Sequence, residues 1–121
     1  MTPEQYTVLA LRTAADRSQS MKLIEAAMGI GGEGGEIVDI LKKVSFYNKD
    51  LDLKHIKEEL GDLLWYVNLM IHAVESTWSE VFEMNIAKLE ARYPDLRFDA
   101  AHAINRDHDA EQNAMKAGAI S

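Results

Sequence analysis

The sequence contains no cysteine and very little proline, and both absences limit what the chain can be. Without cysteine, its 121 residues cannot form disulfides, thiolate metal sites or a cysteine nucleophile. Only Pro3 and Pro94 occur, so the long stretch between them is free to be helical. No apolar run approaches the roughly 18 residues of a membrane span, and no signal-peptide core is recognisable near Met1. We therefore expect a soluble, cytoplasmic protein.

Basic residues are also scarce. Thirteen lysines and arginines stand against twenty aspartates and glutamates, which gives a formal net charge of −7. Proteins that bind nucleic acid or anionic membranes non-specifically use basic patches, so we expect neither as a partner. An acidic chain suits cations, or substrates that arrive bound to cations.

The spacing of apolar residues is helical rather than alternating, which predicts an all-α protein. A chain of this length is expected to form a single domain, here residues 1–121. We predict a four-helix bundle with its core at about residues 20–98 and a polar C-terminal helical arm at about 99–121. The arm would hold one short helix within residues 100–116. The four main helices are predicted at Pro3 to Asp16, Ser20 to Val44, Leu53 to Val74 and, after a capping motif at Thr77 and Glu80, up to Tyr93.

The third and fourth predicted helices carry apolar stripes that we assign to the bundle core. Four helices of this size bury limited apolar surface in a monomer. We therefore expect the chain to assemble as a homodimer or homotetramer. The stripes consist of Ile56, Leu60, Leu63, Leu64, Val67, Met70, Ile71 and Val74, and of Trp78, Val81, Phe82, Ile86 and Leu89.

Five of the seven glycines fall between Gly29 and Gly35, inside the second predicted helix. Glycine is disfavoured by about 1 kcal/mol relative to alanine at each interior helix position. The cluster therefore indicates either a break between two helices or a helix that a neighbour approaches closely. We reject a phosphate-binding glycine loop, because the G-x-x-x-x-G-K-[ST] pattern and a preceding strand are both missing.

Two acidic pairs interrupt these helices at three-residue spacing. Glu33 lies within the apolar stripe of the second helix, and Glu36 lies on its edge. Glu59 and Asp62 flank the stripe of the third helix, so antiparallel packing would bring the two pairs together. Convergent carboxylates repel one another at low dielectric, and hard divalent cations with oxygen ligands relieve that repulsion. We therefore predict an Mg²⁺ site formed by these four carboxylates.

These acids have other interpretations. Acidic pairs arise by chance in an acidic helical protein, and most surface acids are simply solvated. A di-iron bundle would need Glu-x-x-His on two helices, and no histidine in this sequence lies three residues after a glutamate. The position of Glu33 within an apolar stripe favours a metal site over solvated acids, because an unpaired buried carboxylate is costly.

The acidic pairs also carry a family resemblance. The family's signature is E-x-x-E, a spacer of one to two dozen residues, and then E-x-x-D; here 22 residues separate Glu36 from Glu59. The glycines around the first pair and the Leu-Trp-Tyr that follows the second strengthen the match. Over about residues 20–98, the sequence therefore resembles the MazG-like all-α nucleoside triphosphate pyrophosphohydrolases.

The resemblance implies hydrolysis of a nucleoside or deoxynucleoside triphosphate to the monophosphate and pyrophosphate, with Mg²⁺ as cofactor and Mn²⁺ as a substitute. It implies that the four carboxylates hold the metal and carry catalysis, with Glu36 or Glu33 orienting or deprotonating the attacking water. By the same resemblance, substrate contacts fall on residues suited to binding phosphate or sugar or to stacking on a base: Trp65, Tyr66, Asn85, Lys88 and Arg92.

Two alternative functions remain. The related phosphoribosyl-ATP pyrophosphohydrolase shares this fold and carboxylate arrangement, although the Trp65-Tyr66 pair and the long tail favour the broader triphosphate class. A non-catalytic helical oligomerisation module belongs to a different class of protein. It would leave the acids solvated and would not respond to Mg²⁺.

Overall fold

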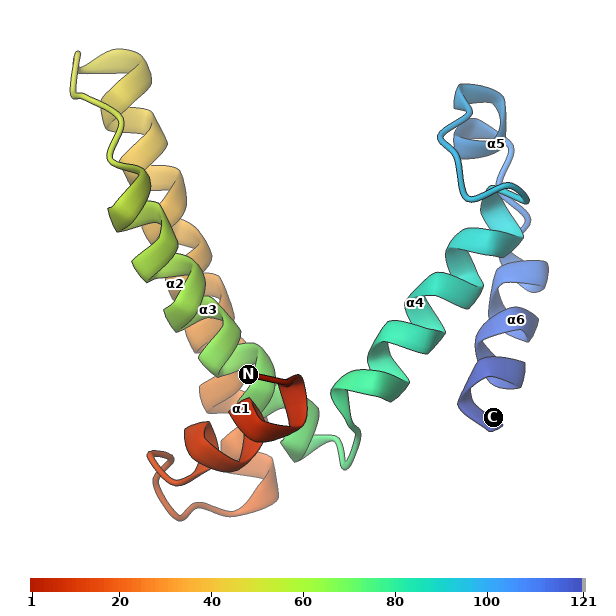
Figure 1. The fold of residues 1–121 in the computed structure, drawn as a ribbon, viewed down its shortest axis with the longest axis horizontal. Coiled ribbons are helices and arrows are strands. Elements are labelled where there is room, and N and C mark those ends of the chain that lie inside the picture. The colour runs from red at the N-terminus through yellow and green to blue at the C-terminus, as the bar shows by residue number, and fades with distance from the viewer. Residues whose placement is uncertain (121) are drawn as a thin grey trace. The chain divides into compact units, whose positions relative to one another are not determined.

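A computed structural model of the chain describes residues 1–120, with side chains through residue 116. All regular structure in this range is helical, as the sequence predicts, and no helix in it is both long and apolar enough to cross a membrane. The helices form two compact units, Met1–Glu75 and Ser76–Ser121. They are α1 (Pro3–Leu11), α2 (Gln19–Phe46), α3 (Leu53–Ala73), α4 (Trp78–Arg92), α5 (Ala100–Ile104) and α6 (His108–Ile120) (Figure 1).

The first unit consists of α1, α2 and α3. Helices α2 and α3 run side by side, and α1 packs on α3 (Figure 1). The side-chain amide of Gln19 donates to the carbonyl of Ala73 (2.8 Å), which links the start of α2 to the end of α3 in antiparallel order. Buried Asn68 accepts a hydrogen bond from Thr7 of α1 (2.9 Å), so its amide oxygen is satisfied inside the core. The buried apolar residues are Ala10, Ala26, Leu69, Ile71 and Ala73.

Helix α2 continues without a break through the glycine cluster, for 28 residues. Of the two interpretations of the cluster, the structure supports a helix that a neighbour approaches closely, and it does so at one position. The ring of Tyr66 on α3 lies so close to Gly29 that a Cβ atom there would overlap it. At the other four glycines of the cluster, a Cβ atom would meet nothing in the described chain. Gly29 therefore sets how closely Tyr66 approaches α2.

The second unit consists of α4, α5 and α6. The predicted cap is confirmed, since the Thr77 hydroxyl accepts a hydrogen bond from the backbone N–H of Glu80 (3.1 Å). Helix α6 packs against α4, and its Glu111 is only 2% exposed. The Glu111 carboxylate accepts hydrogen bonds from Arg92 (2.7 Å) and Arg106 (3.0 Å). The ion pairs of this buried carboxylate thus tie the tail to α4, which the prediction of a polar surface arm did not anticipate.

Two details of the prediction need correction. The tail forms two helices rather than one, because Asp107 begins a new helix by accepting a hydrogen bond from the backbone N–H of Ala110 (3.0 Å). The four-helix bundle and its assembly into an oligomer stay predictions, and Ser121, the end of the predicted arm, lies outside the described residues. Six residues assigned to the core are exposed in the single chain, because periodicity identifies an apolar face without saying what covers it: Leu60, Leu64, Val74, Val81, Phe82 and Ile86.

Candidate metal centre

Three of the four predicted metal ligands converge between α2 and α3. Glu33 projects from α2, and Glu59 and Asp62 project from neighbouring turns of α3. Each offers a carboxylate oxygen, and the three oxygens lie within 4.8 Å of one another. Glu33 and Glu59 are half-buried and Asp62 is exposed, so solvent and ions can reach the cluster. We call these three residues the carboxylate cluster.

The electrostatics of the carboxylate cluster favour a proton or a cation. Partial burial raises the pKa of Glu33 above its ordinary value, and a hydrogen bond with Glu59 adds to the shift. The negative charges of Asp62 and of Glu36 raise the same pKa further. On the outer side, His55 Nε2 lies 3.1 Å from a carboxylate oxygen of Glu59. A positive charge placed among the three carboxylates would oppose the upward shift.

The fourth predicted ligand, Glu36, lies about one turn further along α2 and is exposed. Its charge contributes to the raised pKa of Glu33, but its oxygens are not among the three that converge. Three residues advance an α-helix by slightly less than a full turn, so the two side chains are rotated by roughly 60° about the helix axis. The role of Glu36 as a metal ligand stays a prediction.

The three converging groups suit a hard divalent cation. Mg²⁺ binds carboxylate oxygens and retains several waters, and it commonly takes its remaining ligands from substrate phosphates. Zinc and iron sites in helical bundles usually include histidine nitrogen. A partly exposed, all-oxygen donor set therefore fits Mg²⁺ or Mn²⁺ better than either of these metals.

Both predicted aromatic residues lie beside the carboxylate cluster. Trp65 and Tyr66 line a hollow of about 420 Å³ together with Glu33 and Asp62. The two rings meet edge to face, with centroids 5.0 Å apart and planes at 85°. The indole N–H of Trp65 donates to the hydroxyl of Thr13 (2.9 Å), which ties this ring to the segment after α1. Contact of either ring with a substrate stays a prediction.

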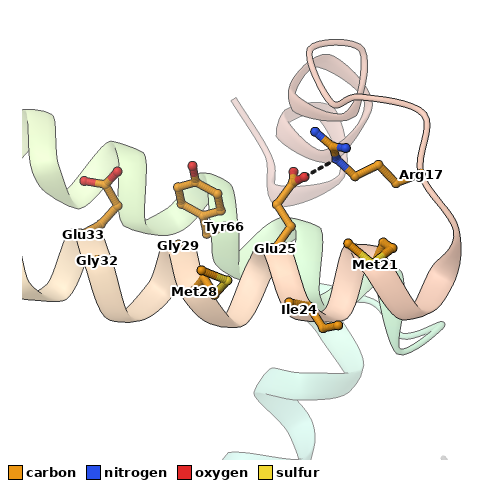
Figure 2. A pocket seen from close by; sticks show the side chains of 9 residues that line it. All are labelled: Arg17, Met21, Ile24, Glu25, Met28, Gly29, Gly32, Glu33 and Tyr66. Atoms are coloured by element: carbon orange, nitrogen blue, oxygen red, sulfur yellow. Dashed lines mark hydrogen bonds and ion pairs between the residues drawn. The ribbon is translucent and has the colours of Figure 1, made fainter.

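A second hollow, of about 460 Å³, follows α2 away from the carboxylates, and we call it the α2 groove (Figure 2). Glu33 lies at one end, the ion pair of Arg17 and Glu25 lies at the other, and Tyr66 lies between them (Figure 2). Because Glu33 and Tyr66 line both hollows, the two share a wall. The groove is lined by Arg17, Met21, Ile24, Glu25, Met28, Gly29, Gly32, Glu33 and Tyr66.

The far part of the α2 groove was missed by sequence reasoning. Met21, Ile24 and Met28 share one helix face by their spacing, and such a stripe is ordinarily assigned to the core. All three are nevertheless exposed, with Met28 at 72%. Arg17 lies in the loop between α1 and α2, and its pairing with a helix residue depends on the path of that loop.

The three predicted phosphate-side residues lie on α4 in the second unit, whereas the carboxylate cluster lies in the first. Asn85 is exposed and Lys88 is half-buried. Arg92 is only 17% exposed and donates through Nε to Glu111, so part of its charge is neutralised within its own unit. The contacts of these residues with substrate stay predictions.

Two comparisons with known proteins relate the chain to others. A model of the MazG nucleotide pyrophosphohydrolase domain matches residues 19–97, a range that includes every predicted site residue. The Gene 37 protein of Mycobacterium phage L5 is 32% identical over 84 residues, which cover 65% of this chain and 73% of the phage protein. No solved structure matches the chain.

Proposed function

The chain belongs to the MazG nucleotide pyrophosphohydrolase family, and on that premise we propose that it hydrolyses a nucleoside or deoxynucleoside triphosphate in the presence of Mg²⁺. Water attacks a phosphorus of the α–β anhydride and the bridging P–O bond breaks, which yields the nucleoside monophosphate and pyrophosphate. The observation that carries the proposal is the convergence of three carboxylates between α2 and α3. Phosphoryl chemistry requires charge neutralisation and positioning rather than a covalent protein group, and such a cluster is suited to it.

We assign Glu33, Glu59 and Asp62 to hold the cation, with Glu36 beside them. A bound divalent cation supplies neutralisation of the phosphate oxygens and lowers the pKa of water. The chain's own contribution is to hold three like charges together on two packed helices. The ring of Tyr66 against Gly29 supports this by fixing the contact between the helices close to Glu33.

The exposed carboxylate of Glu36 is suited to a role in handling the attacking water. It lies outside the three converging groups yet close enough for its charge to act on Glu33. A general base must reach the water without being fully occupied by the metal. We therefore favour Glu36 over Glu33 for orienting or deprotonating the water.

The proposed substrate contacts divide into aromatic and polar side chains. Tyr66 and Trp65 would contact the base or pack behind it, since both line the hollow beside Glu33. On the strength of the family resemblance, Lys88 and Arg92 would contact phosphates and Asn85 a phosphate or the sugar. Arg92 would then serve the phosphates while it also contacts Glu111.

We also propose that the protein works as a homodimer or homotetramer. Apolar side chains on three helices are exposed in the single chain, among them Val38, Leu64 and Phe82 at 65%, 47% and 50%. Covering such residues with a second copy removes apolar surface from water, which is favourable in proportion to its area. Light scattering after size exclusion should therefore give at least twice the mass of one chain.

The proposed reaction can be tested with one assay. Purified protein would be incubated with Mg²⁺ and a panel of ribonucleoside triphosphates, deoxyribonucleoside triphosphates and phosphoribosyl-ATP. Pyrophosphate and orthophosphate would be measured separately. We expect pyrophosphate and a nucleoside monophosphate in equal amounts. Glu36→Gln and Asp62→Asn should each greatly reduce the rate, because each removes a charge from the metal and water site.

Glu58→Gln is the matched control for these variants. Glu58 makes an exposed ion pair with Lys54 (3.8 Å) next to the same motif, and it is not among the converging groups. Its loss should leave the rate unchanged. The proposal fails if no triphosphate yields pyrophosphate, or if the site variants keep the rate of the control. Release of orthophosphate alone would place the cleavage at another bond.

A further inference from the structure

The far end of the α2 groove is charged although its sides are mainly apolar. Arg17 Nε donates to Glu25 Oε2 at 2.5 Å, and the two side chains are 48% and 27% exposed. This bond uses one nitrogen of the guanidinium and one oxygen of the carboxylate. The remaining guanidinium N–H groups and the second carboxylate oxygen can therefore meet a ligand in the groove. A donor and an acceptor stand side by side there.

The length of the groove matches a nucleotide. Glu25 and Glu33 are eight residues apart on one helix, which corresponds to about 12 Å along its axis. That distance is close to the span of an extended nucleotide from the far edge of a purine to its α-phosphorus. Met28 and the ring of Tyr66 line the groove between the two glutamates, where a flat base and a sugar would lie (Figure 2).

From this juxtaposition we propose that Arg17 and Glu25 read the edge of the substrate base and select guanine. The inference rests on the proposed triphosphate hydrolysis, and it assigns the occupant of the groove as the base and sugar of that substrate. Guanine presents two adjacent N–H donors, at N1 and N2, to an acceptor such as Glu25. Its O6 accepts a hydrogen bond from a donor such as Arg17.

The same pair disfavours uracil and thymine. Their edge presents a single N–H between two carbonyl oxygens, so the Glu25 carboxylate would face an oxygen with which it cannot bond. Adenine and cytosine offer one amino donor and one ring acceptor, and they should be intermediate. A polar site that pairs with one base rejects another mainly through the groups it leaves unpaired.

The test compares bases in the full-length protein with Mg²⁺. We expect kcat/KM to be about 5- to 150-fold higher for GTP than for UTP, and for dGTP than for dTTP, because this is the discrimination that one well-formed bidentate contact gives. In Glu25→Gln the ratio should fall towards one, and Arg17→Gln should lower it as well. The matched control Glu58→Gln should keep the wild-type ratio. Circular dichroism would verify that the variants are folded.

Several results would overturn the inference while leaving the proposed function intact. One is a GTP-to-UTP ratio of kcat/KM near one in the wild-type protein, and another is an unchanged ratio in folded Glu25→Gln. If Glu25→Gln changes the oligomeric state and leaves the ratio unchanged, the groove is assigned to a protein interface instead. If no triphosphate is hydrolysed, the proposed function fails, and calorimetry with GMP and UMP then decides the inference separately. Tighter GMP binding that Glu25→Gln abolishes would support it, and equal binding of the two would overturn it.

Discussion

The two units of the molecule treat buried negative charge in opposite ways. In the second unit, Glu111 is almost fully buried and is held by Arg92 and Arg106, with His108 Nδ1 3.7 Å away. In the first unit, the three carboxylates of the cluster face one another. The chain neutralises Glu111 with its own cations, whereas the charges of the other cluster would be relieved by a proton or an added cation. The first arrangement builds structure, and the second is suited to a ligand.

The pKa shifts express this difference. Burial alone would raise the pKa of Glu111, but hydrogen bonds from Arg106 and Arg92 outweigh it and lower the pKa. Burial also raises the pKa of Glu33, and there the neighbouring carboxyl groups raise it further. The desolvation has the same sign in both places, so the charge of the neighbours decides the outcome.

The largest effect is expected from a substitution that gives the carboxylate cluster a positive charge of its own. Glu59→Lys would place an ammonium among the remaining carboxylates and make the first cluster resemble the second. We expect kcat/KM to fall by at least about 10²- to 10³-fold, the loss typical of removing one preorganised charge-stabilising group. The melting temperature in EDTA should rise, because like-charge repulsion is relieved.

Assays of triphosphate hydrolysis and calorimetric titration with Mg²⁺ would measure the effect of Glu59→Lys. His55→Gln, which removes only the outer contact to Glu59, serves as the control and should retain most of the Mg²⁺ binding. An active Glu59→Lys protein would show that the cluster does not bind the catalytic cation.

Breaking the second cluster should affect stability instead. Glu111→Ala removes the buried carboxylate that Arg92 and Arg106 share, and it leaves the half-buried guanidinium of Arg92 unpaired, which is destabilising. We expect the melting temperature to fall by several degrees and Mg²⁺ binding to stay at the wild-type level. Asp109→Ala, on the first turn of the same helix and exposed, should have little effect on melting. A loss of Mg²⁺ affinity in Glu111→Ala would contradict the separation of roles.

The two clusters should also give opposite pH dependences of stability in EDTA. The raised pKa of Glu33 adds stability that is full below the ordinary value of 4.5 and is lost as pH rises through the raised pKa. The lowered pKa of Glu111 adds stability that is present above 4.5 and is lost as pH falls through the lowered pKa.

Melting temperatures between pH 3 and 7 would separate these contributions. Glu33→Gln should flatten the profile above pH 4.5, whereas Glu111→Gln should flatten it below. Identical profiles for the two variants would contradict the assigned signs.

The smallest effect is expected where a change beside the carboxylate cluster touches no charge. A Cβ atom at Gly34 meets open space, so Gly34→Ala should stabilise α2 by up to about 1 kcal/mol. Gly29→Ala should destabilise the protein, because its methyl group would overlap the ring of Tyr66. Chemical denaturation of the two variants gives the comparison. Equal effects would mean that the contact between Gly29 and Tyr66 does not constrain the helices.

Much of the fold follows from local sequence signals. The prolines, the cap at Thr77 and the helical periodicity place the four main helices with small boundary errors. The largest error is in the first helix, which ends at Leu11 rather than near Asp16. Ala14 and Asp16 continue the apolar and polar pattern, but residues 12–18 form the turn that leads into α2. The helical spacing of apolar residues does not reveal such a turn when no proline or glycine marks it.

The candidate site also has features that local sequence signals predict and features that they do not. The convergence of Glu33, Glu59 and Asp62 follows from three-residue spacing and antiparallel packing, so the sequence predicts it. Partners that are distant in the chain were not predictable. Arg92 and Glu111 lie 19 residues apart on separate helices, and Arg17 reaches Glu25 from a loop. These pairs depend on tertiary packing, for which a single sequence offers no periodic signal.

The wall shared by the two hollows has a consequence for inhibitor design. Glu33 and Tyr66 border both the hollow beside the carboxylates and the α2 groove. A compact molecule that joins a metal-chelating acid to an aromatic ring through a short linker could occupy both at once. The second contact would then form at high effective concentration, so the joined molecule should bind more tightly than its two halves.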